Sequence, residues 1–132
     1  LGADGVQIGS RFVASHESSA HINFKKAILD AKEGDTELTL KELTPVRLLK
    51  NDFYSRIQKA YTNHASKDEL VELLGRGRAK KGMFEGDLQN GELEIGQIAG
   101  IMDELLSAKQ IINDLLKEFN DAQNELSKIS LK

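Results

Sequence analysis

The spacing of apolar residues predicts a helix that begins after Ser15 and ends at Gly34. Its apolar residues recur at intervals that place them on one face of an α-helix: Ala20, Phe24, Ala27, Ile28 and Ala31. Ser15 is a typical N-cap residue, because its hydroxyl can accept a hydrogen bond from a first-turn amide. Gly34 is a typical helix end, because glycine adopts the left-handed conformation without a Cβ clash.

The same periodicity predicts three further helices. A short helix carries Phe53, Ile57 and Ala60/Tyr61 on one face. The next begins at a capping box formed by Ser66 and Glu69, and it ends at Gly75. The longest follows a cap formed by Ser107 and Gln110. Its apolar positions are Ile111, Ile112, Leu115, Leu116, Phe119, Ala122 and Leu126.

Glycines interrupt a possible fifth helix. Leu93, Gly96/Gln97 and Gly100/Ile101 have the spacing of one helical face. Because glycines four residues apart lower helix propensity, we expect a close approach of another backbone segment to compensate.

Two segments look extended rather than helical. Residues 5–10 place a short apolar stretch between glycines, which is typical of a buried strand that ends in a tight turn. Buried parallel strands need neighbours, and the sequence barely supplies them. Residues 35–51 have weak strand character, and Pro45 disfavours helix at Thr44. We therefore expect an irregular crossing segment there.

Composition narrows the possible functions. The chain has 132 residues, which suit one domain but are few for a complete nucleotide-dependent enzyme, and it begins with Leu1 rather than Met. We therefore expect a fragment. The absence of Cys excludes disulfides and thiolate metal sites. Few aromatic residues, no Trp and a net charge of -3 argue against nucleic-acid binding. No apolar run is long enough to span a membrane.

The turn that ends the first predicted strand is a candidate phosphate cradle. Gly9 lacks the Cβ that would obstruct an approaching oxyanion, and the Ser10 hydroxyl can donate a hydrogen bond to it. A plain structural turn is the alternative, because strand–Gly–Ser turns are common.

Residues 2–12, GADGVQIGSRF, resemble the last barrel strand and phosphate loop of a flavoenzyme family. This family comprises the nitronate monooxygenases, formerly 2-nitropropane dioxygenases, and the enoyl-acyl-carrier-protein reductases II. Ser10 stands where the family usually has Thr, so the hydroxyl is kept. Further matches follow in the family's order: ESSAH at 17–21, PVR at 45–47, KN at 50–51, GMFEGD at 82–87 and GQIAG at 96–100.

The resemblance implies an α/β protein, the C-terminal fragment of a (β/α)8 TIM barrel with a mainly helical extension. Residues 1–34 would supply the last strand, phosphate loop and helix, and residues 35–132 would cover the barrel mouth. The fragment itself would be mostly α. The implied cofactor is FMN, with its phosphate held by Gln7, Gly9 and Ser10. Gln97 would approach the flavin or substrate. The catalytic His and the Gly-Gly loop would lie upstream.

Two reactions remain open under this resemblance. One is NAD(P)H-dependent reduction of a 2-enoyl thioester, and the other is oxidation of a nitronate. The implied protein is a cytoplasmic homodimer that acts on a small molecule or an acyl thioester, without nucleic acid or membrane. We expect the fragment alone to be inactive. The alternative is a non-catalytic helical module that self-associates through the last predicted helix.

Other ionisable groups offer weaker hypotheses. His16, His21 and His64 are too scattered for a metal site, and surface or capping roles are favoured. The acidic residues Glu85, Asp87, Glu92 and Glu94 form a solvated loop or a cation site, of which the loop is favoured. The basic residues 76–81 form an exposed charged loop or a contact to nucleotide or carrier phosphates, and the exposed loop is again favoured.

Overall fold

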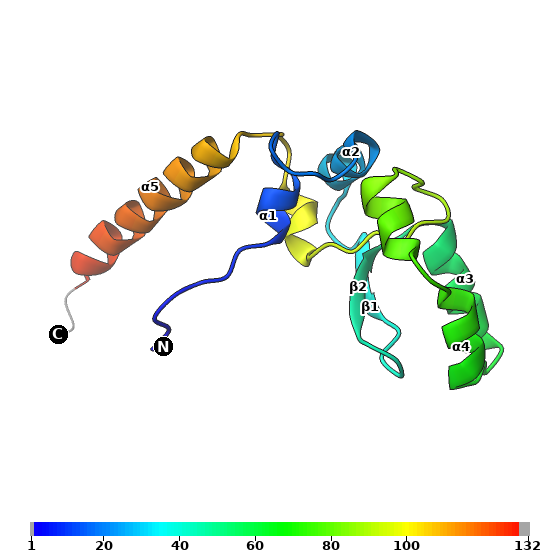
Figure 1. Cartoon of the computed structure of the whole chain (residues 1–132). Coiled ribbons are helices and arrows are strands. Elements are labelled where there is room, and N and C mark those ends of the chain that lie inside the picture. Colours follow the sequence, from blue (N-terminus) through cyan, green and yellow to red (C-terminus); the bar gives the residue numbers. More distant parts are fainter. Residues whose placement is uncertain (1, 130–132) are drawn as a thin grey trace.

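The computed structural model describes residues 2–129. The elements, in chain order, are α1 (Ser10–Val13), α2 (Ile22–Asp30), β1 (Thr36–Thr39), β2 (Val46–Leu49), α3 (Asp52–Thr62), α4 (Lys67–Leu74), the π-helix η1 (Lys80–Phe84), the 3₁₀-helix η2 (Gln97–Ile101) and α5 (Ala108–Ser127). Helices α2, α3 and α4 gather around the β-hairpin, whereas α5 extends away from this body (Figure 1). No helix among residues 2–129 combines the length and apolar character needed to cross a membrane.

The strand predicted at residues 5–10 is not formed. Residues 2–9 have no regular secondary structure and are exposed, and the chain first becomes regular at α1. A parallel strand is stabilised by neighbours on both sides, and the described residues place no strand beside this segment. The sequence pattern is that of a buried strand, but its pairing partners are missing from the described part of the chain.

Helix α2 begins later than predicted and ends earlier, at Asp30 rather than at Gly34. Its N-cap is His21, whose Nδ1 accepts a hydrogen bond from the amide of Asn23 at 3.1 Å. Ser15 instead donates its hydroxyl to the Phe12 carbonyl, at 2.8 Å, and accepts from the Ser18 amide. The predicted apolar stripe is confirmed, since Phe24 and Ile28 are fully buried and the three alanines pack against the same core.

Residues 36–49 form a regular antiparallel hairpin rather than an irregular crossing segment. Thr36 pairs with Leu49 and Thr39 with Val46, and the turn between the strands contains Pro45. The Tyr54 hydroxyl fixes this hairpin on α3 by donating to the Glu37 carboxylate at 2.6 Å. Long-range contacts therefore give this segment the strand structure that its own pattern indicates only weakly.

The segment after residue 90 runs beside β2 instead of forming the predicted helix. The Leu49 amide donates to the Leu93 carbonyl, at 2.9 Å, and the Ile95 amide donates to the Arg47 carbonyl at 3.2 Å. Only residues 97–101 are helical, as η2. The predicted close backbone approach is confirmed, because a Cβ at Gly100 would lie 2.9 Å from the Glu33 nitrogen.

Two hydrophobic clusters hold these elements together. The first joins α2 to the segments on either side of η2, and consists of Ala14, Phe24, Ile28, Leu49, Leu93, Ile95, Ala99 and Met102. The second lies between the hairpin, α3 and α4, and consists of Leu40, Leu48, Phe53, Ile57 and Leu70. Because β2 contributes to both clusters, it couples them into one packed body.

The predicted capping boxes at the starts of α4 and α5 are both confirmed. In each box the serine side chain accepts from the third helical amide, and the third side chain accepts from the serine amide. Helix α4 ends at Gly75, as predicted. Both starts are set by local hydrogen bonds, which explains why four residues suffice to locate them.

Candidate functional site

The corner at Gly9 and Ser10 is open and has unused donors. The Gly9 carbonyl accepts from the amides of Phe12 and Val13, at 2.9 and 3.2 Å, so α1 starts directly after Gly9. Within residues 2–129, no group accepts a hydrogen bond from the amides of Gly9 and Ser10. A Cβ placed at Gly9 would meet nothing within 4 Å. The corner can therefore receive an anion at two main-chain N–H groups.

Ser10 also connects this corner to the C-terminal part of the chain. Its Oγ accepts a hydrogen bond from the Gly96 amide at 3.0 Å, which joins residues 86 positions apart. A Cβ at Gly96 would lie only 2.7 Å from that Oγ, so the approach needs glycine. Because Oγ acts here as an acceptor, its own proton remains free for donation.

The sequence-predicted site residues are brought together only in part. Gln97 is the first residue of η2 and directly follows Gly96, so it lies next to the Ser10 corner with an exposed side chain. Gln7 lies in the irregular segment 2–9 and is exposed. The structure therefore joins Ser10 to the Gly96–Gln97 segment, but leaves Gln7 without a fixed partner among the described residues.

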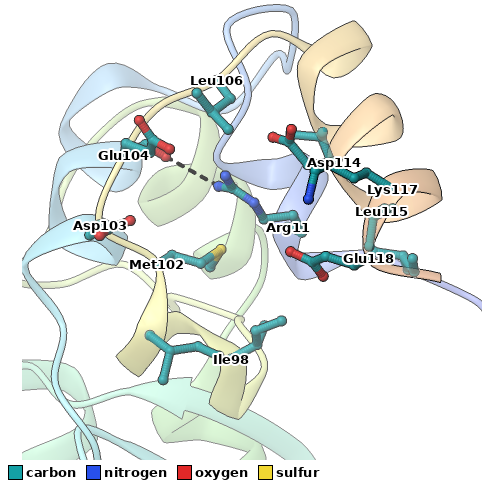
Figure 2. Close-up of a pocket in the computed structure, with 13 residues that line it drawn as sticks. Arg11, Ile98, Met102, Asp103, Glu104, Leu106, Asp114, Leu115, Lys117 and Glu118 are labelled. Atoms are coloured by element: carbon teal, nitrogen blue, oxygen red, sulfur yellow. Dashed lines mark hydrogen bonds between the residues drawn. The ribbon is translucent and has the colours of Figure 1, made fainter. Parts of the chain in front are cut away.

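A hollow of about 540 Å³ lies between α1, η2, residues 102–106 and α5. Arg11 reaches across it and donates from Nη1 to the Glu104 carbonyl at 3.1 Å (Figure 2). Apolar side chains from these elements face the hollow: Ile98, Met102, Leu106 and Leu115. Sequence reasoning missed this hollow, because its walls come from segments that only folding brings together.

Comparisons with known proteins identify the family of the chain. A family model described as nitronate monooxygenase matches residues 1–118. The chain belongs to the nitronate monooxygenase family.

Two curated relatives in this family are each described as a probable nitronate monooxygenase. The protein of Bacillus subtilis is 33% identical over 119 residues, which are 89% of this chain and 34% of the relative. The protein of Staphylococcus saprophyticus is 31% identical over 126 residues, which are 94% of this chain and 35% of the relative. The chain thus spans about a third of the length of these relatives.

Solved structures of FabK from Thermotoga maritima resemble the chain in three dimensions. One structure superposes with a TM-score of 0.84 at 38% sequence identity, and covers 96% of this chain and 40% of the FabK chain. A point mutant of FabK gives a TM-score of 0.77 at the same identity, with 96% and 37% covered. The arrangement of the described residues is therefore shared with part of a larger protein.

The other family motifs have structural roles here. Gly82 and Gly91 allow two backbone segments to cross closely, since a Cβ at Gly82 would lie 2.7 Å from the Glu92 carbonyl oxygen. A Cβ at Gly86 would overlap the ring of His21. Of the two roles favoured for it, surface or capping, His21 has the capping role, because its side chain accepts from the Asn23 amide. Among residues 2–129, no group of three potential ligands could hold a metal ion.

Among the basic residues 76–81, Arg76, Lys80 and Lys81 are exposed, as favoured for this segment, whereas Arg78 is not a free surface cation. The Arg78 guanidinium donates to the carbonyls of Leu73, Leu74 and Asn90, at 3.0, 2.7 and 2.8 Å, and lies over the Phe53 ring. Desolvation, together with the positive charge of a neighbouring arginine, lowers the pKa of Arg78. In this family member Arg78 thus closes the end of α4.

The neighbouring lysines pair with the acidic loop. Lys80 lies 3.3 Å from Glu85, and Lys81 lies 3.1 Å from Asp87. Hydrogen bonds from the Asn90 amide above all lower the pKa of Asp87 to about 2. Burial raises the pKa of Glu92, and the negative charge of Glu94 raises it further. Lys80 and Lys81 are therefore paired with acidic residues of this region, whereas Arg76 and Glu94 are exposed and Glu92 is buried.

Proposed function

We propose that this chain is the phosphate-binding part of an FMN-dependent oxidoreductase, with Gly9 and Ser10 as donors to the FMN phosphate. The open corner at these residues carries the proposal. Its two amides have no acceptor among the described residues, and no side chain closes the space above Gly9. Membership of the nitronate monooxygenase family supports the choice of flavin.

The residues present fit a phosphate group. Two free amides and a hydroxyl proton can donate to the oxygens of a phosphate, and glycine allows the phosphate to approach the backbone. The Gly96 amide holds the Ser10 oxygen at 3.0 Å and leaves the hydroxyl proton available for donation. Gln7 would add a side-chain donor once residues 2–9 are ordered as a strand. FMN, when bound, would supply the redox chemistry, while the chain supplies binding and orientation.

The C-terminal residues would cover the site. In this proposal residues 1–34 supply the last barrel strand, phosphate loop and helix, and residues 35–132 lie over the barrel mouth. The Ser10–Gly96 contact supports this arrangement, because it places the exposed Gln97 beside the loop. Gln97 would thus approach the flavin or substrate. The catalytic residue and the remaining phosphate contacts would come from outside this chain, which alone would be inactive.

The comparisons favour one of the two reactions only slightly. The higher identity to FabK, 38%, supports an enoyl-acyl-carrier-protein reductase that uses NAD(P)H. The curated relatives, at 33% and 31% identity, support a nitronate monooxygenase. We propose the reductase as the first activity to assay, with an acyl thioester as substrate.

Titration with FMN tests the cradle. The product of the complete gene is expected to quench FMN fluorescence, and Gly9→Val to raise the FMN dissociation constant by roughly 10-fold or more, because a branched side chain would occupy the phosphate's space. Ser19→Val is the matched control, since Ser19 is exposed and lies outside the corner. An unchanged FMN affinity in Gly9→Val would refute the cradle.

A helical self-association module is the second candidate. The outer face of α5 favours it, because Ile112, Leu116, Phe119 and Leu126 are 48% to 68% exposed. In this proposal α5 packs against a second copy to form a homodimer. Sedimentation equilibrium distinguishes a homodimer from a monomer. A monomer at high micromolar concentration would refute this second candidate function.

A further inference from the structure

Lys25 is a buried lysine that forms no direct ion pair among the described residues, although it interacts electrostatically with the nearby Glu17 carboxylate. Its residue surface is only 5% exposed, although it sits on α2 beside the exposed Lys26. None of the ion pairs among residues 2–129 includes Lys25. A buried ammonium without hydrogen bonds would cost far more than it contributes, so its surroundings must replace the lost water.

Three main-chain carbonyls replace that water. Lys25 Nζ donates to the carbonyls of Ser15 at 2.6 Å, Ser18 at 2.8 Å and His16 at 3.4 Å. An ammonium group has three donors, so the three carbonyls can satisfy it completely. We call this group of carbonyls, contributed by residues 15–18, the carbonyl cage.

The carbonyl cage is connected through α1 to the corner at Gly9 and Ser10. The Ser15 hydroxyl donates to the Phe12 carbonyl, at 2.8 Å, and so fixes the end of the four-residue helix that begins at Ser10. The buried Ala14, in the first hydrophobic cluster, lies between α1 and the cage. Displacement of the cage would therefore move the corner at its far end.

The carbonyl cage is also attached to the start of α5. The His16 amide donates to the Leu106 carbonyl at 2.9 Å. The Glu17 carboxylate accepts from the Ala108 amide, at 2.9 Å, in the first turn of α5. This hydrogen bond above all lowers the pKa of Glu17. The same four residues thus bind the lysine on one side and α5 on the other.

We propose that the Lys25 ammonium is an internal cation that positions two elements, the Ser10 corner and the first turn of α5, by holding the carbonyl cage in one conformation. Lys25 is a positioning residue, because it acts through residues 15–18. Its role toward α5 stands on the contacts above. Its role toward FMN binding rests on the proposed function.

Hydrogen–deuterium exchange in the product of the complete gene tests the role of the charge. In Lys25→Ala, exchange at the amides of His16 and Ala108 is expected to accelerate by roughly 10-fold or more, because three carbonyls lose a charged donor. Lys26→Ala, which removes the exposed neighbouring lysine, is expected to leave both amides unchanged. Wild-type exchange rates in Lys25→Ala would overturn the proposal.

Chemical rescue separates the charge from the side-chain volume. Lys25→Ala removes three methylenes and the ammonium, so added propylammonium is expected to restore slow exchange, whereas n-propanol is not. Equal rescue by n-propanol would overturn the proposal, since an uncharged stem with a single hydroxyl donor would then suffice. If Lys25→Ala fails to fold, Lys25→Met keeps an apolar stem without the charge, and wild-type exchange in that variant would be equally decisive.

FMN titration of the same variants adds an independent measurement. The FMN dissociation constant is expected to rise in Lys25→Ala and to return toward the wild-type value with propylammonium. If the wild-type protein binds no FMN, the proposed function fails, while the exchange data still decide whether the cation holds α5. If FMN binds and its affinity is unchanged in Lys25→Ala, the role toward the corner is refuted.

Discussion

Helices α2 and α5 have the same kind of sequence pattern but opposite surroundings. Both carry apolar residues at helical spacing, and α5 has the better start, a complete capping box. Phe24 and Ile28 of α2 are fully buried, whereas Phe119 of α5 is 64% exposed and only Ile111 of that helix is buried. The periodicity of apolar residues therefore identifies which face of a helix is suited to packing. It does not show whether the described residues include the surface against which that face packs.

Residues 2–9, near the other end of the chain, also combine a pattern typical of buried structure with exposed apolar side chains. Val6 is 85% exposed although its segment has the composition of a buried strand. The chain spans about a third of the length of the curated relatives it matches, and both unpacked regions contribute residues, such as Ile8 and Leu115, to the lining of the hollow that Arg11 crosses. These exposed apolar residues fit the proposal that a further part of the protein, or a second copy, packs against them.

The largest expected contrast compares phenylalanines in the two helices. Phe24→Ala is expected to lower the free energy of unfolding by about 3–5 kcal/mol, because it leaves a cavity in the first hydrophobic cluster. Phe119→Ala is expected to change it by less than about 0.5 kcal/mol, as for most exposed sites. Urea unfolding followed by circular dichroism measures both. A loss of several kcal/mol in Phe119→Ala that grows with protein concentration would show that a second copy covers α5.

Sequence patterns predicted the fold where local interactions decide it. The capping boxes at Ser66 and Ser107 involve side chains three residues apart, so the start of each helix is readable from four residues. The hairpin at 36–49 and the extended segment around Leu93 were not predicted, because pairing between β1 and β2, and hydrogen bonds from β2 to residues 93–95, override weak local preferences there.

In the candidate site, too, the features that depend on local sequence were predicted, and those that depend on distant contacts were not. Gly9 and Ser10 were recognisable, because a glycine followed by a hydroxyl at a turn already has a chemical meaning. The Gly96 amide that holds Ser10 was not, since 86 residues separate the two partners. The role of Lys25 was equally hidden, because its three acceptors are main-chain carbonyls whose positions depend on the folded turn. Because every residue has a main-chain carbonyl, the amino-acid sequence does not reveal which carbonyls will accept a hydrogen bond.

Substitutions of two glycines in the packed body are expected to change the free energy of unfolding by a smaller amount than Phe24→Ala. Gly34 and Gly86 both have positive φ, 87° and 79°, but a Cβ at Gly34 would meet nothing within 4 Å, whereas one at Gly86 would overlap the His21 ring. Gly34→Ala is expected to cost about 1–2 kcal/mol, from the left-handed backbone alone. Gly86→Ala is expected to cost about 2–4 kcal/mol, since overpacking is added. Equal losses by urea unfolding would show that the His21 contact contributes nothing.

The smallest expected effect is the acid dependence of the loop at Asp87. The pKa of Asp87 is held at about 2 in the fold, below its ordinary value of 3.8, chiefly by the Asn90 amide. Because the folded pKa is the lower one, the carboxylate stabilises the fold above about pH 4, and this contribution disappears as the pH falls toward 2.

Asp87→Asn is therefore expected to be less stable than the wild type at pH 7, and the difference is expected to shrink between pH 4 and pH 2. Asp121→Asn is the matched control, because Asp121 forms an exposed ion pair with Lys117 on α5, the unpacked helix. Such pairs contribute little, so its urea midpoint should follow the wild type at every pH. If the deficit of Asp87→Asn persists at pH 2, the geometry of the side-chain amide, and not the lost charge, weakens the loop. The ionised carboxylate would then have no special role in holding η1 against Asn90.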